Sequence, residues 1–186
     1  MLMANETAPE ALELIEFWHH EAGPKLWFNG PPEFDELFRQ RFLALYERAT
    51  TGELDGWTAT PSGSLALILL LDQFPRNAFR GTPRAYESDA HAHRIATLAT
   101  AWGQDMLIDP ELRLFMYLPF GHSERLADQE RAGELVTHLG PQHATRAGRY
   151  TDIIRRFGRF PHRNAILGRE STSAEELFLR NGGFSG

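Results

Sequence analysis

The chain has 186 residues, of which 42% are hydrophobic and 24% charged, and it contains no cysteine. This composition excludes a disordered or collagen-like chain, and a chain of this length buries roughly two thirds of the surface that its unfolded form exposes. The absence of cysteine excludes thiol catalysis, iron–sulfur clusters, zinc fingers and disulfides. We therefore expect a folded protein with an ordinary hydrophobic core.

Charge is unevenly distributed along the chain. The net charge is −6, yet residues 146–170 hold seven arginines against two acidic residues. An acidic chain argues against nucleic-acid binding over a whole surface, because neutralising phosphates requires a basic face. The run 155–163 interleaves arginine with phenylalanine like a base-stacking surface, but the acidic remainder of the chain would repel a polyanion. We expect no nucleic-acid partner.

Membrane and export signals are missing. The longest apolar run, Leu65–Leu71, is too short to cross a bilayer. Residues 1–18 have no basic region ahead of an apolar core, so they do not resemble a signal peptide. These features predict a cytoplasmic protein with no membrane partner.

The first half of the chain shows three helical patterns. Apolar residues recur at helical spacing over residues 9–20 and again over 32–50, where Gly52 ends the pattern. The segment 61–73 is apolar on nearly every side, which predicts a buried helix at the centre of the fold. We expect this helix to end or kink near Gln73, because the following proline cannot donate a backbone hydrogen bond.

Threonine–proline and aspartate–proline pairs indicate two further helices. We expect one from Thr82-Pro83 to Gly103, with Thr82 as its N-cap. We expect another after Asp109-Pro110, stopped by Pro119.

Capping residues predict the last three helices. Ser123 is expected to cap a helix over 124–139, and a helix over 142–157 should end at Gly158. The segment 171–179 offers two capping boxes, which are Thr172 with Glu175 and Ser173 with Glu176.

No stretch shows the alternation or the hairpin turns of a sheet, so the sequence predicts an all-α fold of about eight helices. Short loops favour antiparallel helix pairs, stacked as a bundle or as a repeat-like array. We expect a single all-α domain over residues 1–186.

A repeated sequence motif suggests two related halves within that domain. Residues 74–82 read FPRNAFRGT, and residues 160–168 read FPHRNAILG, with His162 as an insertion. Each copy follows a predicted helix, so we treat the loops 72–82 and 159–172 as equivalent. Equivalent loops of two halves can face each other, and we expect these two to do so.

Three segments combine polar groups with bulky apolar neighbours, at 71–77, 117–124 and 156–164. Polar groups held against so much apolar surface must bond to one another or to a ligand, because an unmatched buried group costs about 1–3 kcal/mol. In the functional interpretation, the planar guanidinium groups of Arg76 and Arg163 bind a carboxylate or a phosphate through paired hydrogen bonds. Arg159 or Arg169 contributes a further guanidinium group. His122 or His162 then transfers protons near neutral pH. The full set of candidate ligand-binding residues is Asp72, Gln73, Arg76, Asn77, Glu124, Arg159, Arg163, Asn164 and Arg169.

A structural interpretation stands beside the functional one. In it, the arginines pair with Asp72, Glu124, Asp128 and Glu170, and the asparagines cap helix ends. Buried arginine–carboxylate networks often have this role alone.

A metal site is a further alternative. His122, Glu124, His162 and Asp72 offer nitrogen and oxygen ligands for zinc, manganese or iron. No established metal spacing such as H-E-x-x-H occurs, however. We expect neither a metal nor another cofactor.

The chain contains three long motifs, LALILLLDQFPRN at 65–77, YLPFGHSE at 117–124 and RFGRFPHRNAILGREST at 156–172, and shorter ones at 17–18, 27–28, 34–35, 128–130 and 176–179. Together these motifs resemble a family of uncharacterised, mainly bacterial proteins, the domain-of-unknown-function family 924. The resemblance covers nearly the whole chain and implies a tetratricopeptide-like, right-handed superhelical array of helices. It implies no activity.

Two hypotheses follow from these observations. The first is a pocket, lined by arginine and histidine, that binds a small anion, with catalysis left open. The alternative is a tetratricopeptide-like scaffold whose polar loops are structural and whose groove receives a protein partner or a second copy.

Overall fold

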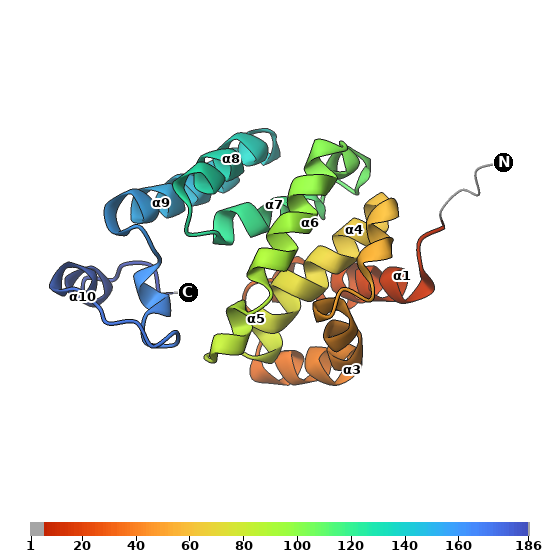
Figure 1. Ribbon diagram of the computed structural model, residues 1–186, viewed down its shortest axis with the longest axis horizontal. Helices are drawn as coiled ribbons and strands as arrows, with labels where there is room; N and C mark the ends of the chain where they lie inside the picture. The colour runs from red at the N-terminus through yellow and green to blue at the C-terminus, as the bar shows by residue number, and fades with distance from the viewer. Residues whose placement is uncertain (1–5, 186) are drawn as a thin grey trace. The chain divides into compact units, whose positions relative to one another are not determined.

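The computed structural model describes residues 6–185, and no strand occurs among them (Figure 1). Of the ten α-helical segments in that range, eight have eight or more residues. The all-α fold is therefore confirmed, whereas the superhelical array stays a prediction. Residues 1–5, part of the stretch in which we expected no signal peptide, lie outside the described residues.

None of the helices in the described range is long and apolar enough to cross a membrane. The cytoplasmic location stays a prediction.

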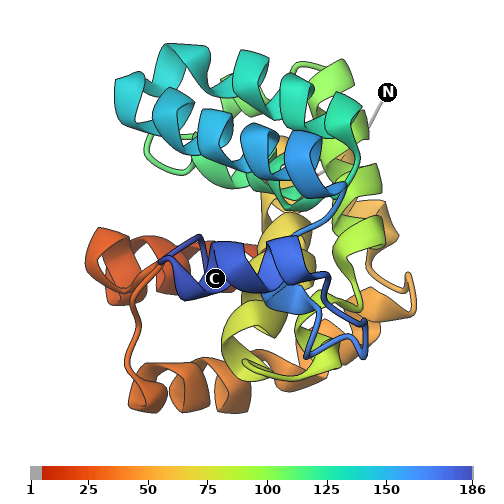
Figure 2. The same ribbon diagram turned by 90° about the vertical axis from the view of Figure 1, so that its left-hand side faces the viewer.

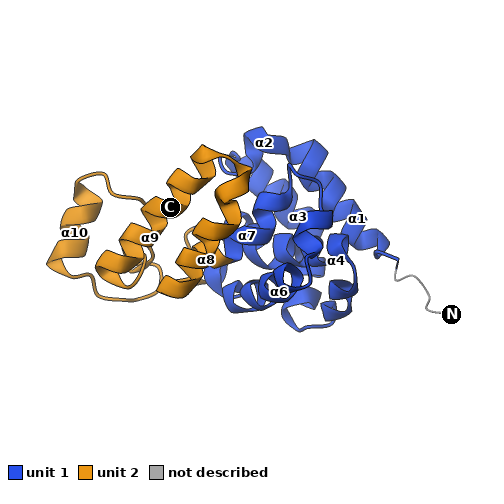
Figure 3. Ribbon diagram, turned by 90° about the horizontal axis from the view of Figure 1, so that it is seen from above, with its two compact units in different colours: residues 1–80, 84–119 blue, residues 81–83, 120–186 orange. Residues whose placement is uncertain are grey.

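The chain forms two compact units (Figure 3). Of the described residues, unit 1 comprises 6–80 and 84–119, and unit 2 comprises 81–83 and 120–185. The loops 72–82 and 159–172 fall largely in different units, and their equivalence stays a prediction.

A long buried rod forms the centre of unit 1. It consists of α4 (Pro61–Ile68), a π-helical turn (Leu69–Gln73) and α5 (Phe74–Ala78), and every residue from 63 to 75 is buried. The helices around it are α1 (Pro9–Glu16), α3 (Pro32–Thr50) and α6 (Asp89–Ala101). The expectation of a central buried helix is confirmed.

Local chemistry explains where the rod begins and where it becomes irregular. The Thr60 hydroxyl accepts a hydrogen bond from the Gly63 N–H (3.1 Å), which caps the first turn of α4. The irregularity expected near Gln73 is the π-helical turn, after which the chain continues as α5. Pro75 lies in the first turn of α5 and cannot donate to the preceding turn, and the Leu71 carbonyl, four residues before it, accepts a hydrogen bond from the Ser88 hydroxyl (2.6 Å) instead.

Aromatic rings fill the core of unit 1 around Phe38 of α3. The Phe38 ring centroid lies 5.3 Å from those of Phe17 and Trp18 and 5.1 Å from that of Phe74. Phe17 and Trp18 belong to a π-helical turn (Phe17–Ala22) that joins α1 to α2 (Gly23–Leu26). The first predicted helix thus extends beyond its expected end.

Two expected boundaries in the middle of the chain are wrong. Thr82 does not start a long helix, because Pro83–Tyr86 is a 3₁₀ turn and α6 begins only at Asp89. Pro119 does not stop its helix, because α7 (Arg113–His122) continues through it. Residues 114–120 are all buried, so packing outweighs the hydrogen bond that Pro119 cannot donate.

Unit 2 is built on a hairpin of two helices that lie side by side (Figure 2). These are α8 (Leu126–Val136) and α9 (Pro141–Phe157), and α9 ends at Gly158 in a left-handed conformation, as predicted. The last helix is α10 (Ser173–Arg180).

Capping in unit 2 follows only part of the prediction. Arg125, and not Ser123, is the N-cap of α8. The capping box of Thr172 with Glu175 is confirmed, whereas Ser173 is already the first residue of α10.

Gly63 and Gly133 test whether close packing outweighs helix propensity. A Cβ at Gly63 would lie 2.1 Å from the Trp57 carbonyl oxygen, so Gly63→Ala should destabilise unit 1 by about 1–3 kcal/mol. A Cβ at Gly133, inside α8, meets nothing within 4 Å, so Gly133→Ala should stabilise its helix by about 0.5–1 kcal/mol. Urea unfolding followed by circular dichroism measures both changes, and equal effects would contradict the packing argument.

Candidate functional site

The polar residues of the first predicted segment form one cluster in unit 1, organised by Arg76. Its guanidinium donates to both Asp89 carboxylate oxygens (2.7 and 2.9 Å) and to the Asp72 carbonyl (2.8 Å). The Asp72 carboxylate lies 3.2 Å from the same guanidinium and accepts from the Gln73 amide (2.6 Å). The Asn77 amide donates to the Gln73 carbonyl (2.9 Å).

Arg76 is therefore engaged by carboxylates. Burial by itself would lower the pKa of Arg76, but the charges of Asp72 and Asp89 raise that pKa above its ordinary value. The guanidinium stays charged, and two of its N–H groups donate to the Asp89 carboxylate. Sequence reasoning missed Asp89 because the predicted helix begins at Pro83, whereas α6 begins at Asp89 and so places this aspartate in its first turn, a favoured position.

In unit 2, Glu124 and Arg169 form the equivalent centre. The Arg169 fork donates to both Glu124 oxygens (2.7 and 3.0 Å), and the Phe160 N–H also donates to Glu124 (2.8 Å). Arg169 donates further to the Asn164 side chain (2.9 Å) and to the Phe160 carbonyl (3.1 Å). The network fixes the backbone of Phe160 on both sides, through its N–H and its carbonyl.

The Glu124 carboxylate is held ionised by this network. Burial by itself would raise the pKa of Glu124, but the Arg169 fork, the Phe160 N–H and the Arg163 charge lower it below its ordinary 4.5. Arg163 is only 6% exposed, and its guanidinium stacks 4.6 Å from the Phe160 ring centroid.

A second ion pair anchors the start of α10. Arg159 donates to both Glu175 oxygens (2.7 and 2.8 Å) and to the Glu170 carbonyl (2.8 Å). Glu175 also accepts from the Thr172 N–H (2.8 Å) and is 2% exposed. The Arg159 hydrogen bond, against the opposing effect of burial, lowers the pKa of Glu175 to about 2.

The two candidate histidines have different surroundings. His122 is the last residue of α7 and is half-buried. The His162 ring packs edge-on to Phe184, with 4.9 Å between the centroids. The proton-transfer roles of both residues stay predictions.

The structure thus sorts the predicted site residues into two groups. Asp72, Gln73, Arg76 and Asn77 lie together in unit 1, and Glu124, Arg159, Arg163, Asn164 and Arg169 belong to unit 2. A shared pocket built from both groups stays a prediction. Within residues 6–185, no three His, Asp or Glu side chains are placed so as to hold a metal ion.

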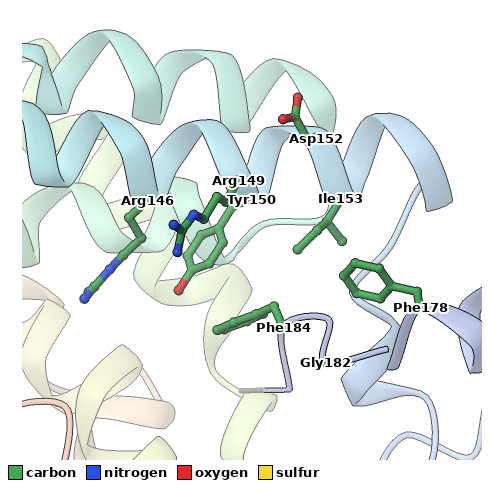
Figure 4. A pocket seen from close by; sticks show the side chains of 8 residues that line it. All are labelled: Arg146, Arg149, Tyr150, Asp152, Ile153, Phe178, Gly182 and Phe184. Carbon is green, nitrogen blue, oxygen red and sulfur yellow. The ribbon is translucent and has the colours of Figure 1, made fainter. Parts of the chain in front are cut away.

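A cavity of about 510 Å³ lies in unit 2, where sequence reasoning placed no site (Figure 4). It opens between α9 and the segment at the end of α10. The residues that line it are Arg146, Arg149, Tyr150, Asp152, Ile153, Phe178, Gly182 and Phe184. Its volume lies in the range of small-molecule sites.

The helical repeat explains how α9 supplies one wall of the cavity. Arg146, Arg149, Tyr150 and Ile153 are spaced i, i+3, i+4 and i+7, which places them on one face of the helix. Two arginines on a face that also carries a tyrosine and an isoleucine were a signal available in the sequence. From the sequence we predict a helix and a locally cationic segment here, and no site.

A tight turn after α10 supplies the opposite wall. The Gly183 N–H donates to the Phe178 carbonyl (2.9 Å), and Gly182 adopts a φ of 77°. A Cβ at Gly183 would lie 2.6 Å from the Phe178 ring, so only glycine fits there. The turn places the Phe184 ring 4.9 Å from that of Tyr150.

The cavity is cationic at one end. Arg149 is exposed and forms no ion pair within the described part of the chain, and Arg146 is also exposed. Asp152 points away from the cavity in Figure 4 and lies 3.7 Å from Arg155. Burial, and after it the charge of Arg146, lower the pKa of His143 below its ordinary 6.5.

Comparison with known proteins supports the fold and supplies no activity. The family model described as "Bacterial protein of unknown function (DUF924)" matches residues 14–183. A solved structure of a protein of unknown function from Agrobacterium tumefaciens is 46% identical, covers 95% of this chain and 100% of its own, and has a TM-score of 0.91. None of the curated proteins compared with the chain matches it.

Glu175 gives a testable dependence of stability on pH. Its pKa is about 2 in the folded protein against an ordinary 4.5, so the unfolded chain binds the proton more readily. The stability that Glu175 contributes is therefore complete above pH 4.5 and is lost as the pH falls towards 2. Glu175→Gln should lower the free energy of unfolding by about 1–3 kcal/mol at neutral pH and flatten its fall in acid.

The matched control is Glu176→Gln, since Glu176 is an exposed neighbour on the same helix. Urea unfolding at a series of pH values measures all three proteins. A Glu175→Gln curve parallel to that of the wild type would contradict the ion-pair assignment.

Proposed function

Because the chain belongs to the DUF924 family of bacterial proteins, whose function is unknown, we propose a function from the geometry of unit 2. The protein binds a small anionic ligand in the cavity between α9 and the end of α10. The observation that carries this proposal is Arg149, an exposed arginine on the cavity wall with no ion pair within the described residues.

The charge at the cavity favours an anion. Arg146 and Arg149 lie one turn apart on the same face of α9, and the one acid that lines the cavity, Asp152, points away from it (Figure 4). Guanidinium groups bind carboxylates and phosphates through paired, charge-assisted hydrogen bonds. The cationic end of the cavity therefore attracts an oxyanion.

The loop 159–172 holds the residues that pack against the walls of this cavity. Glu124 and Arg169 hold the backbone of Phe160, whose ring packs 5.7 Å from that of Tyr150. Arg159 and Glu175 fix the start of α10, the helix that carries Phe178. These residues therefore act as positioning groups in the proposal, and Arg146 and Arg149 replace Arg76 and Arg163 as the groups that bind the anion.

Benzoate and benzamide form a matched pair of probes that differ in charge. We expect the wild type to bind benzoate more tightly than benzamide, and Arg149→Gln to weaken benzoate binding about tenfold, as expected for one charge-assisted hydrogen bond. Isothermal titration calorimetry measures both affinities. Bound benzoate should also raise the pKa of His143 by offsetting the charge of Arg146, which an NMR titration detects.

Arg155→Gln is the matched control for Arg149→Gln. Arg155 lies on α9 outside the cavity and forms exposed ion pairs with Glu130 (3.2 Å) and Asp152 (3.7 Å), which contribute little to stability. Equal binding of benzoate and benzamide, or equal losses in the two arginine variants, would overturn the proposed function.

An exposed apolar stretch in unit 1 favours a second candidate, a scaffold that binds a protein partner. Leu98, Trp102, Met106 and Leu107 are 41%, 61%, 58% and 73% exposed and fall within ten residues. Large apolar side chains that are exposed and concentrated in one short stretch of the chain favour an interaction site.

Self-association is the measurable form of the scaffold candidate. If this surface binds a second copy of the chain, sedimentation velocity should show a dimer that weakens on dilution and is lost in Trp102→Ser. A wild type that stays monomeric at all concentrations would exclude the homodimer.

A further inference from the structure

The cavity of unit 2 has two chemically different ends (Figure 4). Arg146 and Arg149 lie at one end, and Ile153 and Phe178 lie at the other. The Tyr150 and Phe184 rings lie between them. A ligand that fills the cavity therefore meets cations at one end and hydrocarbon at the other.

The hydrocarbon end is fixed from behind. The Phe178 ring packs against Phe157 with 5.1 Å between the centroids, and the Phe184 ring is held by Tyr150 and His162, each at 4.9 Å. Ile153 is 7% exposed. Rings held in this way form a stable wall against which a flat apolar group can stack.

Gly182 leaves space beside that wall. A Cβ at Gly182 would meet nothing within 4 Å, although this residue lines the cavity. Its φ of 77° favours glycine, so a larger residue is disfavoured there. The space next to Phe178 and Phe184 is thus kept free of side chains by the backbone conformation.

The spacing along α9 sets the length of the ligand. Arg149 and Ile153 are four residues apart, which corresponds to about 6 Å along the helix axis. A ring and an oxyanion joined by a short linker span this distance. An isolated inorganic anion would leave the aromatic end in contact with water alone.

The side chains at the apolar end also argue against a nucleotide base. Ile153, Phe178 and Phe184 offer no side-chain hydrogen-bond donor or acceptor. The polar edges of a base would lose their bonds to water there without replacement, which is unfavourable. A hydrocarbon ring loses nothing polar on entry.

We infer that the ligand is an arylalkyl oxyacid, with one aromatic ring packed between Phe178 and Phe184 and one terminal carboxylate or phosphate on Arg146 and Arg149. This inference rests on the proposed anion-binding function. The proposed function requires only a negatively charged group, and the inference specifies the aromatic part of the ligand as well.

Pairs of probe molecules that share a charged group and differ in the rest of the molecule test the inference. In isothermal titration calorimetry with the full chain, we expect 3-phenylpropanoate to bind about tenfold or more tightly than propanoate, because one stacked ring contributes about that factor. Adenosine monophosphate, which has a polar base, should bind no better than ribose 5-phosphate, which has the same phosphate and no base. Phenyl phosphate separates the two oxyacids, since tighter binding than that of 3-phenylpropanoate assigns a phosphate.

Variants of the aromatic wall link the effect to the cavity. Phe178→Leu and Phe184→Leu should each weaken 3-phenylpropanoate binding several-fold and leave propanoate binding unchanged. Leu177→Ala is the matched control, because Leu177 is a half-exposed neighbour on α10 that does not line the cavity. Circular dichroism checks that the variants are folded, and the two phenylalanine variants are independent tests should one of them unfold.

The possible failures are distinguishable. If propanoate binds as tightly as 3-phenylpropanoate and Arg149→Gln weakens both, the anion site stands and the arylalkyl inference is overturned. If 3-phenylpropanamide binds as tightly as 3-phenylpropanoate, the proposed anion-binding function fails as well. Tighter binding of adenosine monophosphate than of phenyl phosphate, or the absence of binding by every probe, overturns the inference.

Discussion

A carboxylate that leaves water needs a cation or N–H donors, and this requirement organises the polar residues of both units. In unit 1, Asp72 and Asp89 surround Arg76. In unit 2, Glu124 is bound by Arg169 and by the Phe160 N–H, and the positions of Phe160 and its neighbours depend on that pair. Arginines next to buried acids are thereby committed to the protein. An arginine available to a ligand must lie away from them, as Arg149 does on α9.

The cavity of unit 2 combines a rigid wall with an uncommitted charge. The Glu124–Arg169 pair fixes the backbone of Phe160, whose ring supports Tyr150. The glycine turn after α10 places Phe184 on the other side of Tyr150. Preorganised walls lower the entropic cost of binding, because few side chains have to be ordered by the ligand. The ion pairs of unit 2 thus position the side chains that form the proposed binding site.

Secondary structure followed the sequence where one residue type had one physical role. Gly158 marks a helix end through a left-handed conformation and the Thr172–Glu175 box marks one through local hydrogen bonds, and both were found as predicted. The prediction for Pro119 failed because burial competes with local preference. Residues 114–120 are all buried, so the helix continues through Pro119. Thr82 and Pro83 are exposed, and there the chain forms a 3₁₀ turn before α6 begins.

The sequence by itself determined the all-α class, the buried helix at the centre of unit 1 and the family, because helical periodicity and long motifs are properties of neighbouring residues. It also identified Asp72, Glu124 and Arg169 as groups that need partners. Only the tertiary structure decided which partners they have, since Glu124 and Arg169 lie 45 residues apart. The cavity was likewise decided by tertiary structure, because α9 and the turn after α10 form its walls only once the chain has folded.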